Sequence, residues 1–179
     1  MNFSVQKKPK VENVEKLQVK SPKDVYNLEI IQEIKDAVQE HFIFVGLDNR
    51  NNIRVITMLG IGSSCGINID SKDILRTALI NACDKVILVH NHPSNSLVPS
   101  KHDIYLSNIT NKFLKIFNVK MVDHIIVTEN EYQSMEELKD IDRNYIDDKL
   151  DFVDKVLLLE ENKRLKSNNT KRKDRDRDE

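Results

Sequence analysis

The amino-acid sequence predicts a single α/β domain built in layers. Strand-like and helix-like segments alternate from residue 71 onward, which is typical of layered α/β proteins. The stretch Lys85 to Val89 (KVILV) is an unbroken apolar run, as expected of a strand that is covered on both faces. With 179 residues, of which 39% are hydrophobic and 32% charged, the chain suffices for one full domain with solvated extensions.

The first elements predicted along the chain are a helix and a β-hairpin. Residues 1–20 are polar and rich in lysine, and we expect a flexible N-terminal arm there. A helix is expected to begin at Ser21, because Ser21 and Asp24 have capping-box spacing with proline between them. Its apolar stripe consists of Val25, Leu28, Ile31, Ile34 and Val38. Segments 42–48 and 53–59 are rich in β-branched and aromatic residues and predict the hairpin.

A helix, a strand, a second helix and a second strand follow. Ser71 is a candidate cap for a helix with apolar positions at Leu75, Leu79 and Ile80. After the strand at 85–89, a capping box from Ser100 to Asp103 predicts the next helix. This helix carries Ile104, Leu106, Ile109, Phe113 and Ile116. Residues 119–128 predict another strand, and residues 146–166 a last helix.

Composition excludes some classes of protein and leaves others open. Two cysteines outside a CxxC pattern argue against a disulfide-stapled secreted domain. No apolar run approaches the roughly 20 residues of a membrane span, and the N-terminus lacks a signal-peptide core. We therefore expect a cytoplasmic protein without a membrane partner. Residues 163–179 hold eight basic and four acidic side chains, whereas the whole chain has a net charge of -1. This basic tail could therefore contact nucleic acid.

Two histidines and an aspartate suggest a metal site at the end of the buried strand. His90 and His92 point to the same side because side chains alternate along a strand. Asp103 falls in the first turn of the next helix, able to face back toward the strand end. Two imidazoles and one carboxylate suit a tetrahedral zinc ion with water as the fourth ligand. The alternative is that His90 is a core histidine, His92 a loop residue and Asp103 an ordinary helix-cap acid. The spacing of all three residues after a buried strand favours the metal site.

The same stretch resembles a known family. The JAMM motif, H-x-H followed by S-x-x-D, is similar to HNHPSNSLVPSKHD, in the variety seen in RadC-like proteins of the JAB/MPN metalloprotease superfamily. Likeness to the RadC-like domain extends from about residue 21 to 138, through SPKDVYNL, QEHFIFVGLDNRNNI and VDHIIVTENEYQSMEE. Departures occur at Asn95 and Ser96, where glycine and an acid or amide are usual, and at Lys72 and Asp73, where relatives carry Arg-Glu.

The resemblance implies a fold and a set of site residues. It implies a JAB/MPN-like mixed β-sheet flanked by helices, followed here by a C-terminal helix and a charged tail. It implies zinc held by His90, His92 and Asp103, and a glutamate before an early strand that works on the bound water. Glu40 occupies that position, and the alternative for it is an exposed acid at a helix end. In the family, the serine matching Ser100 also donates to the oxygen that becomes negative, in addition to capping its helix.

Domain boundaries follow from the pattern and the resemblance together. We expect an arm over 1–20, a RadC-like JAB/MPN domain over 21–140, a helical extension over 141–166 and a disordered charged tail over 167–179. Many full-length relatives carry an upstream helix-hairpin-helix module, for which we expect no room. Of the other polar candidates, we expect His41 to be structural, His102 to be exposed, and His124 to be a core histidine or a contact of a ligand. Cys65 lies in a Gly/Ser-rich loop and is a weak candidate.

Three functions are consistent with these patterns. The first is a zinc hydrolase that cuts a peptide or isopeptide bond in a protein substrate. The second is a DNA-repair-associated nucleic-acid-binding protein or metal-dependent nuclease, since RadC-like proteins were named for an association with DNA repair. The third is a non-catalytic interaction module in which the last helix binds a partner or forms a homodimer. The complete set Glu40, His90, His92, Ser100 and Asp103 favours the first.

Overall fold

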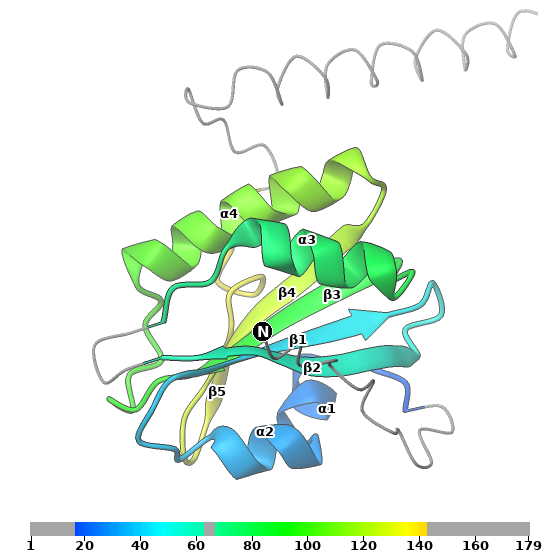
Figure 1. Cartoon of the computed structure of the whole chain (residues 1–179). Coiled ribbons are helices and arrows are strands. Elements are labelled where there is room, and N and C mark those ends of the chain that lie inside the picture. Colours follow the sequence, from blue (N-terminus) through cyan, green and yellow to red (C-terminus); the bar gives the residue numbers. More distant parts are fainter. Residues whose placement is uncertain (1–16, 63–66, 143–179) are drawn as a thin grey trace, which may run out of the picture. The chain divides into compact units, whose positions relative to one another are not determined.

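A five-stranded sheet covered by helices makes up the described part of the chain, which comprises residues 17–62 and 67–142 of the computed structural model. The strands are β1 (His41–Leu47), β2 (Ile53–Ile61), β3 (Lys85–Asn91), β4 (Lys120–Val127) and β5 (Tyr132–Ser134). The helices are α1 (Pro22–Tyr26), α2 (Glu29–Ile34), α3 (Ser71–Ile80) and α4 (Lys101–Ile116). Figure 1 shows α3 and α4 on one face of the sheet and α1 and α2 on the other. The predicted α/β layered class is confirmed.

Strand pairing is mixed, in the order β2-β1-β3-β4-β5. β1 and β2 form the predicted hairpin, and the Asp48 carboxylate stabilises the turn by accepting backbone N–H groups of Arg50 and Asn52, each at 2.8 Å. β1 also pairs antiparallel with β3, whereas β3 and β4 run parallel and are connected through α4. The central β3 is therefore buried on both faces, as its unbroken apolar run predicts.

The helix predicted to begin at Ser21 is divided in two. Ser21 and Asp24 do form the capping box, with the Asp24 carboxylate accepting the Ser21 N–H at 2.8 Å. The expectation of one continuous helix is wrong because Leu28 has an extended backbone with ψ 137, which ends the first helix and starts the second. The predicted apolar positions 25, 28, 31 and 34 are buried, but Val38 lies beyond α2 and is 84% exposed.

The start and inner face of α3 also differ from the sequence-based expectation. Asp70, rather than Ser71, is the N-cap, and its carboxylate accepts the Lys72 N–H at 2.9 Å. The inner face consists of Ile74 and Ala78, while Leu79 and Ile80 are exposed. The α4 expectation is confirmed: Ser100 caps the helix, and its Oγ accepts the Asp103 N–H at 3.1 Å.

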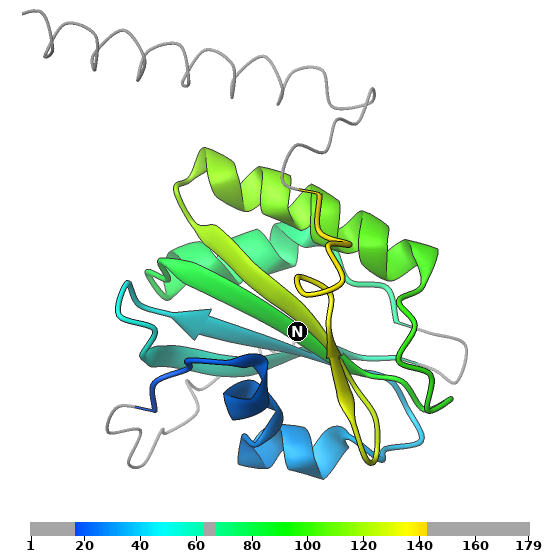
Figure 2. The ribbon, with the colours of Figure 1, turned by 180° about the vertical axis from the view of Figure 1, so that it is seen from behind.

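The two edges of the sheet contain features that the sequence pattern leaves open. Gln18, within the predicted arm, forms an isolated bridge with Asn52, and Val19 is buried. At the opposite edge, the three-residue strand β5 lies beyond β4 (Figure 2). Among the described residues, no helix has the length and apolarity needed to cross a membrane. The predicted helix at 146–166, the tail at 167–179 and Cys65 lie outside the described residues.

Candidate metal centre

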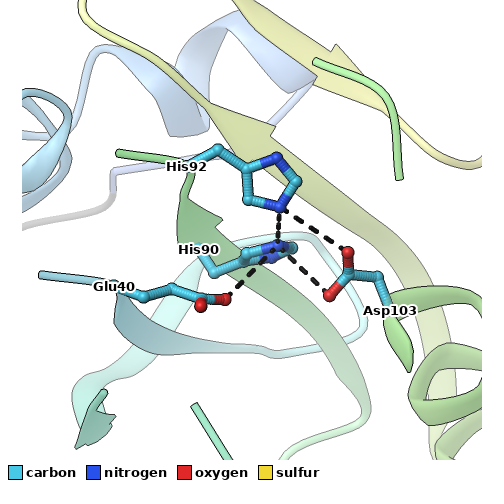
Figure 3. A group of neighbouring side chains, drawn as sticks. All are labelled: Glu40, His90, His92 and Asp103. Carbon is cyan, nitrogen blue, oxygen red and sulfur yellow. Dashed lines mark hydrogen bonds and ion pairs between the residues drawn. The ribbon is translucent and has the colours of Figure 1, made fainter. Parts of the chain in front are cut away.

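The end of β3 and the start of α4 bring the predicted ligands together. His90 is the penultimate residue of β3, His92 follows the strand, and Asp103 is the third residue of α4. His90 and Asp103 are buried, and His92 is half-buried. Their donor atoms face one another: His90 Nε2 lies 3.3 Å from Asp103 Oδ1, and His92 Nε2 lies 3.6 Å from Asp103 Oδ2 (Figure 3).

Glu40 completes the group from the opposite side. It precedes β1, which pairs antiparallel with β3, so that the start of β1 lies beside the end of β3. Its Oε1 is 3.8 Å from His90 Nε2, and its side chain retains 14% exposure (Figure 3). The donor atoms of Glu40, His90, His92 and Asp103 all lie within 4.8 Å of one another. The four residues therefore line a shared space that is partly open to solvent.

The spacing of these atoms fits one small divalent cation. Ligands bound about 2.1 Å from a tetrahedral centre lie roughly 3.4 Å apart. The two histidine–aspartate separations, 3.3 and 3.6 Å, bracket that value, and the two Nε2 atoms lie 2.9 Å apart. Imidazole nitrogen and carboxylate oxygen are common ligands of zinc and its first-row neighbours. The group could therefore hold a metal ion.

Asp103 divides its carboxylate between folding and the cluster. Oδ2 accepts the Ser100 N–H at 2.7 Å, which closes the capping box, and Oδ1 faces His90. The two sequence interpretations of Asp103, as cap acid and as cluster member, therefore describe the same side chain. Because the cap holds Oδ2 at the helix start, where it also lies 3.6 Å from His92 Nε2, the orientation of the whole carboxylate is fixed and Oδ1 is directed toward His90.

The electrostatics of the group favour bound positive charge. Burial opposes ionisation of Asp103, but the interactions of its carboxylate with the neighbouring His90 and His92 rings outweigh burial and hold the pKa of this carboxyl well below its ordinary value. Burial lowers the pKa of His92, yet the Asp103 carboxylate and the Ser96 carbonyl raise it overall. Within residues 17–62 and 67–142, neither Asp103 nor Glu40 has an ion pair with lysine or arginine. A dication would supply that missing charge.

The loop after His92 fixes which ring nitrogen faces the cluster. His92 Nδ1 lies 2.6 Å from the Ser96 carbonyl oxygen, which can only accept. Nδ1 therefore carries the proton, and the Nε2 of the neutral ring presents its lone pair to the cluster. Asn95 has φ 55 in this turn, a left-handed conformation that asparagine adopts more readily than most residues, so it can stand where relatives carry glycine.

Sequence reasoning missed the role of Asn91, which lies between the two histidines and points to the other face. Its side chain is fully buried. Oδ1 accepts the His41 N–H at 2.6 Å, and Nδ2 donates to the carbonyls of Ala37 and Gln39 at 3.2 and 3.0 Å. These three bonds bracket Glu40 and tie its backbone to the strand that carries the histidines. Alternation along the strand accounts for the direction of Asn91, but no rule of spacing identifies these partners.

Contacts behind His90 were also beyond sequence reasoning. His90 Nδ1 lies 2.9 Å from His124 Nε2, and His124 Nδ1 lies 2.6 Å from Ser107 Oγ. His124 was expected to be a core histidine or a contact of a ligand; it is buried in the core and contacts His90, one of the predicted ligands. Burial, followed by the nearby His90, lowers the pKa of His124 well below its usual value, so this ring is neutral. The Asp123 carboxylate accepts the backbone N–H of His124 rather than contacting its ring.

The remaining candidates lie at the margin or away from the group. Ser100 is exposed and borders it through Asp103; because the cap uses its oxygen as acceptor, the hydroxyl proton is not needed for the cap. His41 contacts the Gln39 carbonyl through Nδ1 at 2.8 Å, a local structural bond. His102 is exposed, as expected.

Comparison with known proteins identifies relatives of this chain. The model of the RadC-like JAB domain family matches residues 19–140. A UPF0758 protein of Methanosarcina barkeri is 33% identical over 122 residues, which cover 68% of this chain and 53% of the relative. Similar UPF0758 proteins of Caldanaerobacter subterraneus and Staphylococcus haemolyticus are 32% and 29% identical over 123 residues, covering 69% of this chain and 52% and 54% of those proteins. The chain thus spans about half the length of the curated relatives it matches.

Proposed function

This chain belongs to the RadC-like JAB domain family, and from that premise we propose that it is a zinc-dependent hydrolase of the JAMM type that cleaves a peptide or isopeptide bond. Family membership and the cluster of Glu40, His90, His92 and Asp103 support a metal-dependent, hydrolase-like role. The observation that carries the proposal is the convergence of these four donor groups within 4.8 Å at the partly open end of β3.

Three residues hold the metal in this proposal. His90 and His92 contribute Nε2, and Asp103 contributes the carboxylate that faces both. Two nitrogens and one oxygen suit zinc better than magnesium or calcium, which prefer oxygen ligands. Zinc, when bound, supplies a Lewis acid and lowers the pKa of a coordinated water from 15.7 toward about 7.

Glu40 acts as the proton carrier. Its Oε1 lies farther from His90 Nε2 than Asp103 Oδ1 does, 3.8 against 3.3 Å, and it is the more exposed carboxylate. A carboxylate at that position can take a proton from the attacking water at Oε1 and return it to the leaving amine nitrogen. The new C–O bond forms first and makes the substrate carbonyl oxygen negative; the C–N bond breaks when that oxygen re-forms the C=O bond and the protonated amine leaves. The Ser100 hydroxyl proton can then donate to the substrate oxygen that becomes negative.

The substrate in this proposal is a peptide or protein in the cytoplasm. Nucleic-acid binding through residues 163–179 and homodimer formation through 146–166 stay proposals from the sequence, because both segments lie outside the described residues. DNA binding across a salt series, with the basic residues of 163–179 replaced by serine, tests the first. Light scattering on the full chain tests the second.

The direct test of the mechanism replaces Glu40. Glu40→Gln keeps the size of the side chain but removes the proton acceptor, and Glu33→Gln on the exposed face of α2 is the matched control. Turnover is measured on a panel of ubiquitin-like, isopeptide and peptide substrates, and zinc by elemental analysis. We expect Glu40→Gln to lose turnover by at least about 100-fold while zinc stays near one equivalent per chain, and the control to match wild type. Turnover that survives in Glu40→Gln would contradict its role, and loss of zinc would make Glu40 a ligand.

A further inference from the structure

A buried chain of hydrogen bonds leads from the back of His90 to α4. His90 Nδ1 contacts His124 Nε2 at 2.9 Å, and His124 Nδ1 contacts Ser107 Oγ at 2.6 Å. Ser107 Oγ then donates to the backbone carbonyl of Asp103 at 2.6 Å. His90, His124 and Ser107 are fully buried, and Phe42 packs against both rings, at centroid distances of 5.8 and 5.4 Å. These polar atoms therefore satisfy one another without bulk water.

The direction of the protons along this chain follows from its last acceptor. The Asp103 carbonyl can only accept, and Ser107 has one hydroxyl proton to donate to it. Ser107 Oγ must then accept from His124 Nδ1–H. A neutral His124 has no proton left for Nε2, which accepts from His90 Nδ1–H. His90 is thereby left with a lone pair on Nε2, the atom that faces Glu40, His92 and Asp103.

The opposite arrangement would disable the ligand. If Ser107 donated to His124 Nδ1, His124 Nε2–H would donate to His90 Nδ1. The proton of a neutral His90 would then occupy Nε2, and that atom could not bind a cation. The choice between the two arrangements is made at Ser107. Its Oγ donates its one proton to the Asp103 carbonyl at 2.6 Å, so that proton is not available to His124 Nδ1.

We propose that His124 and Ser107 are positioning residues that fix the tautomer and ring orientation of His90 for metal binding. This inference rests on the proposed function, in which His90 is a ligand. Asp103 lies at both ends of the chain, because its carboxylate faces His90 Nε2 and its carbonyl accepts the Ser107 proton. The first turn of α4 therefore orients one ligand directly and another through His124. Partners behind a ligating histidine typically change metal affinity 10- to 100-fold.

The test compares variants that differ in one hydrogen-bonding property. His124→Leu removes the acceptor for His90 Nδ1–H, whereas His124→Gln retains an amide oxygen where Nε2 lies. Ser107→Ala removes the acceptor for His124 Nδ1–H. Thr110→Val is the matched control: this buried threonine lies on α4 one turn later, and its Oγ1 has no hydrogen-bond partner among the described residues. The zinc dissociation constant of each full-length variant is measured by competition with a chelator, alongside thermal unfolding.

We expect His124→Leu to weaken zinc binding by about 10- to 100-fold, His124→Gln to recover most of that loss, and Thr110→Val to match wild type. The zinc affinity of Ser107→Ala should lie between those of His124→Leu and His124→Gln. Wild-type affinity in a folded His124→Leu variant would overturn the inference. Equal losses in His124→Leu and Thr110→Val would also overturn it, because they would reflect general core damage rather than the hydrogen bond.

The tautomer of His124 can also be measured in the wild-type protein, which tests the inference even if a variant does not fold. Ring nitrogen NMR of zinc-loaded, 15N-labelled protein distinguishes the two tautomers. We expect a proton on Nδ1 and a bare Nε2 for His124, and the reverse assignment would overturn the inference. The outcomes separate the two proposals. A wild-type protein that binds no zinc would contradict the proposed function. A wild-type protein that binds zinc with an affinity unaffected by substitution of His124 would contradict only the positioning role of His124 and Ser107.

Discussion

Replacing Asn91 with alanine is expected to destabilise the protein by cutting the connection between β3 and the segment that carries Glu40. The Asn91 side chain is fully buried and makes three hydrogen bonds to backbone groups of Ala37, Gln39 and His41. Alanine at this position removes all three at once. It leaves the backbone of β3 unchanged, so His90 and His92 keep their places in the strand end.

The size of the destabilisation depends on which of the three backbone groups can hydrogen-bond to water once the Asn91 side chain is removed. The His41 N–H loses a 2.6 Å bond in a partly buried position, which costs about 1–3 kcal/mol. The carbonyls of Ala37 and Gln39 belong to half-buried and exposed residues and can be rehydrated, so together they cost about 1 kcal/mol. The expected loss is about 2–4 kcal/mol in the free energy of unfolding, a large part of the usual 5–15 kcal/mol. For a domain of this size it lowers the melting temperature by roughly 10 °C.

Urea unfolding of wild type, Asn91→Ala and Asn81→Ala measures the loss. Asn81 is the matched control because its side chain makes one local bond, to the Thr77 carbonyl at 2.9 Å, at the end of α3. We expect less than about 1 kcal/mol from this control. Zinc affinity should change by less than about 3-fold in Asn91→Ala, since no ligand is removed. A loss in Asn91→Ala no larger than in Asn81→Ala would refute the inferred connection.

Two further predictions concern Gly46 in the hairpin and the buried Cys83, which lies beside it. A Cβ at Gly46 would collide with Cys83 Sγ and lie 2.8 Å from Val55 Cγ1, so Gly46→Ala should cost about 1–3 kcal/mol in urea unfolding. Gly60→Ala is its control, since a Cβ there meets only flexible isoleucine ends at 3.0 and 3.1 Å, and an equal loss would contradict the packing argument. Burial raises the pKa of the Cys83 thiol to about 11. In a Cys65→Ser variant, where Cys83 is the one remaining thiol, the native protein should therefore react with iodoacetamide at pH 8 at least about 100-fold more slowly than the unfolded chain. Its reactivity should rise as the pH approaches 11, and native labelling at the unfolded rate would disprove its burial.

Elements with a local physical signal were predictable from the sequence. The capping box at Ser100 and the alternation of His90 and His92 each depend on residues within a few positions of one another, and the structure has the helix and the strand where they were expected. The inner face of α3 was not predictable in this way. Ile74 and Ala78 are four residues apart, as are Leu75 and Leu79, so periodicity alone offers two equivalent stripes. Contact with the sheet decides between them.

Long-range contacts explain what the sequence left open at the candidate site. The partners of Asn91 lie about fifty residues earlier, and Ser107 and His124 meet only because α4 packs on β4. Neither pairing has a spacing rule that sequence reasoning could apply. The break at Leu28 is similar, because its apolar positions continue a helical stripe while its backbone turns extended. Residue types thus indicated the donor groups, and tertiary packing determined what lies behind them.

The metal content of the purified protein tests the central claim most directly. Elemental analysis after loading with zinc and dialysis is carried out on wild type, His92→Ala and His102→Ala. His102 is the matched control, an exposed histidine in the same turn of α4 as Asp103. We expect about one zinc per chain in wild type and in His102→Ala, and less than about a tenth of that in His92→Ala. Wild type without zinc, or His92→Ala with as much as wild type, would contradict the claim that these side chains form a metal centre.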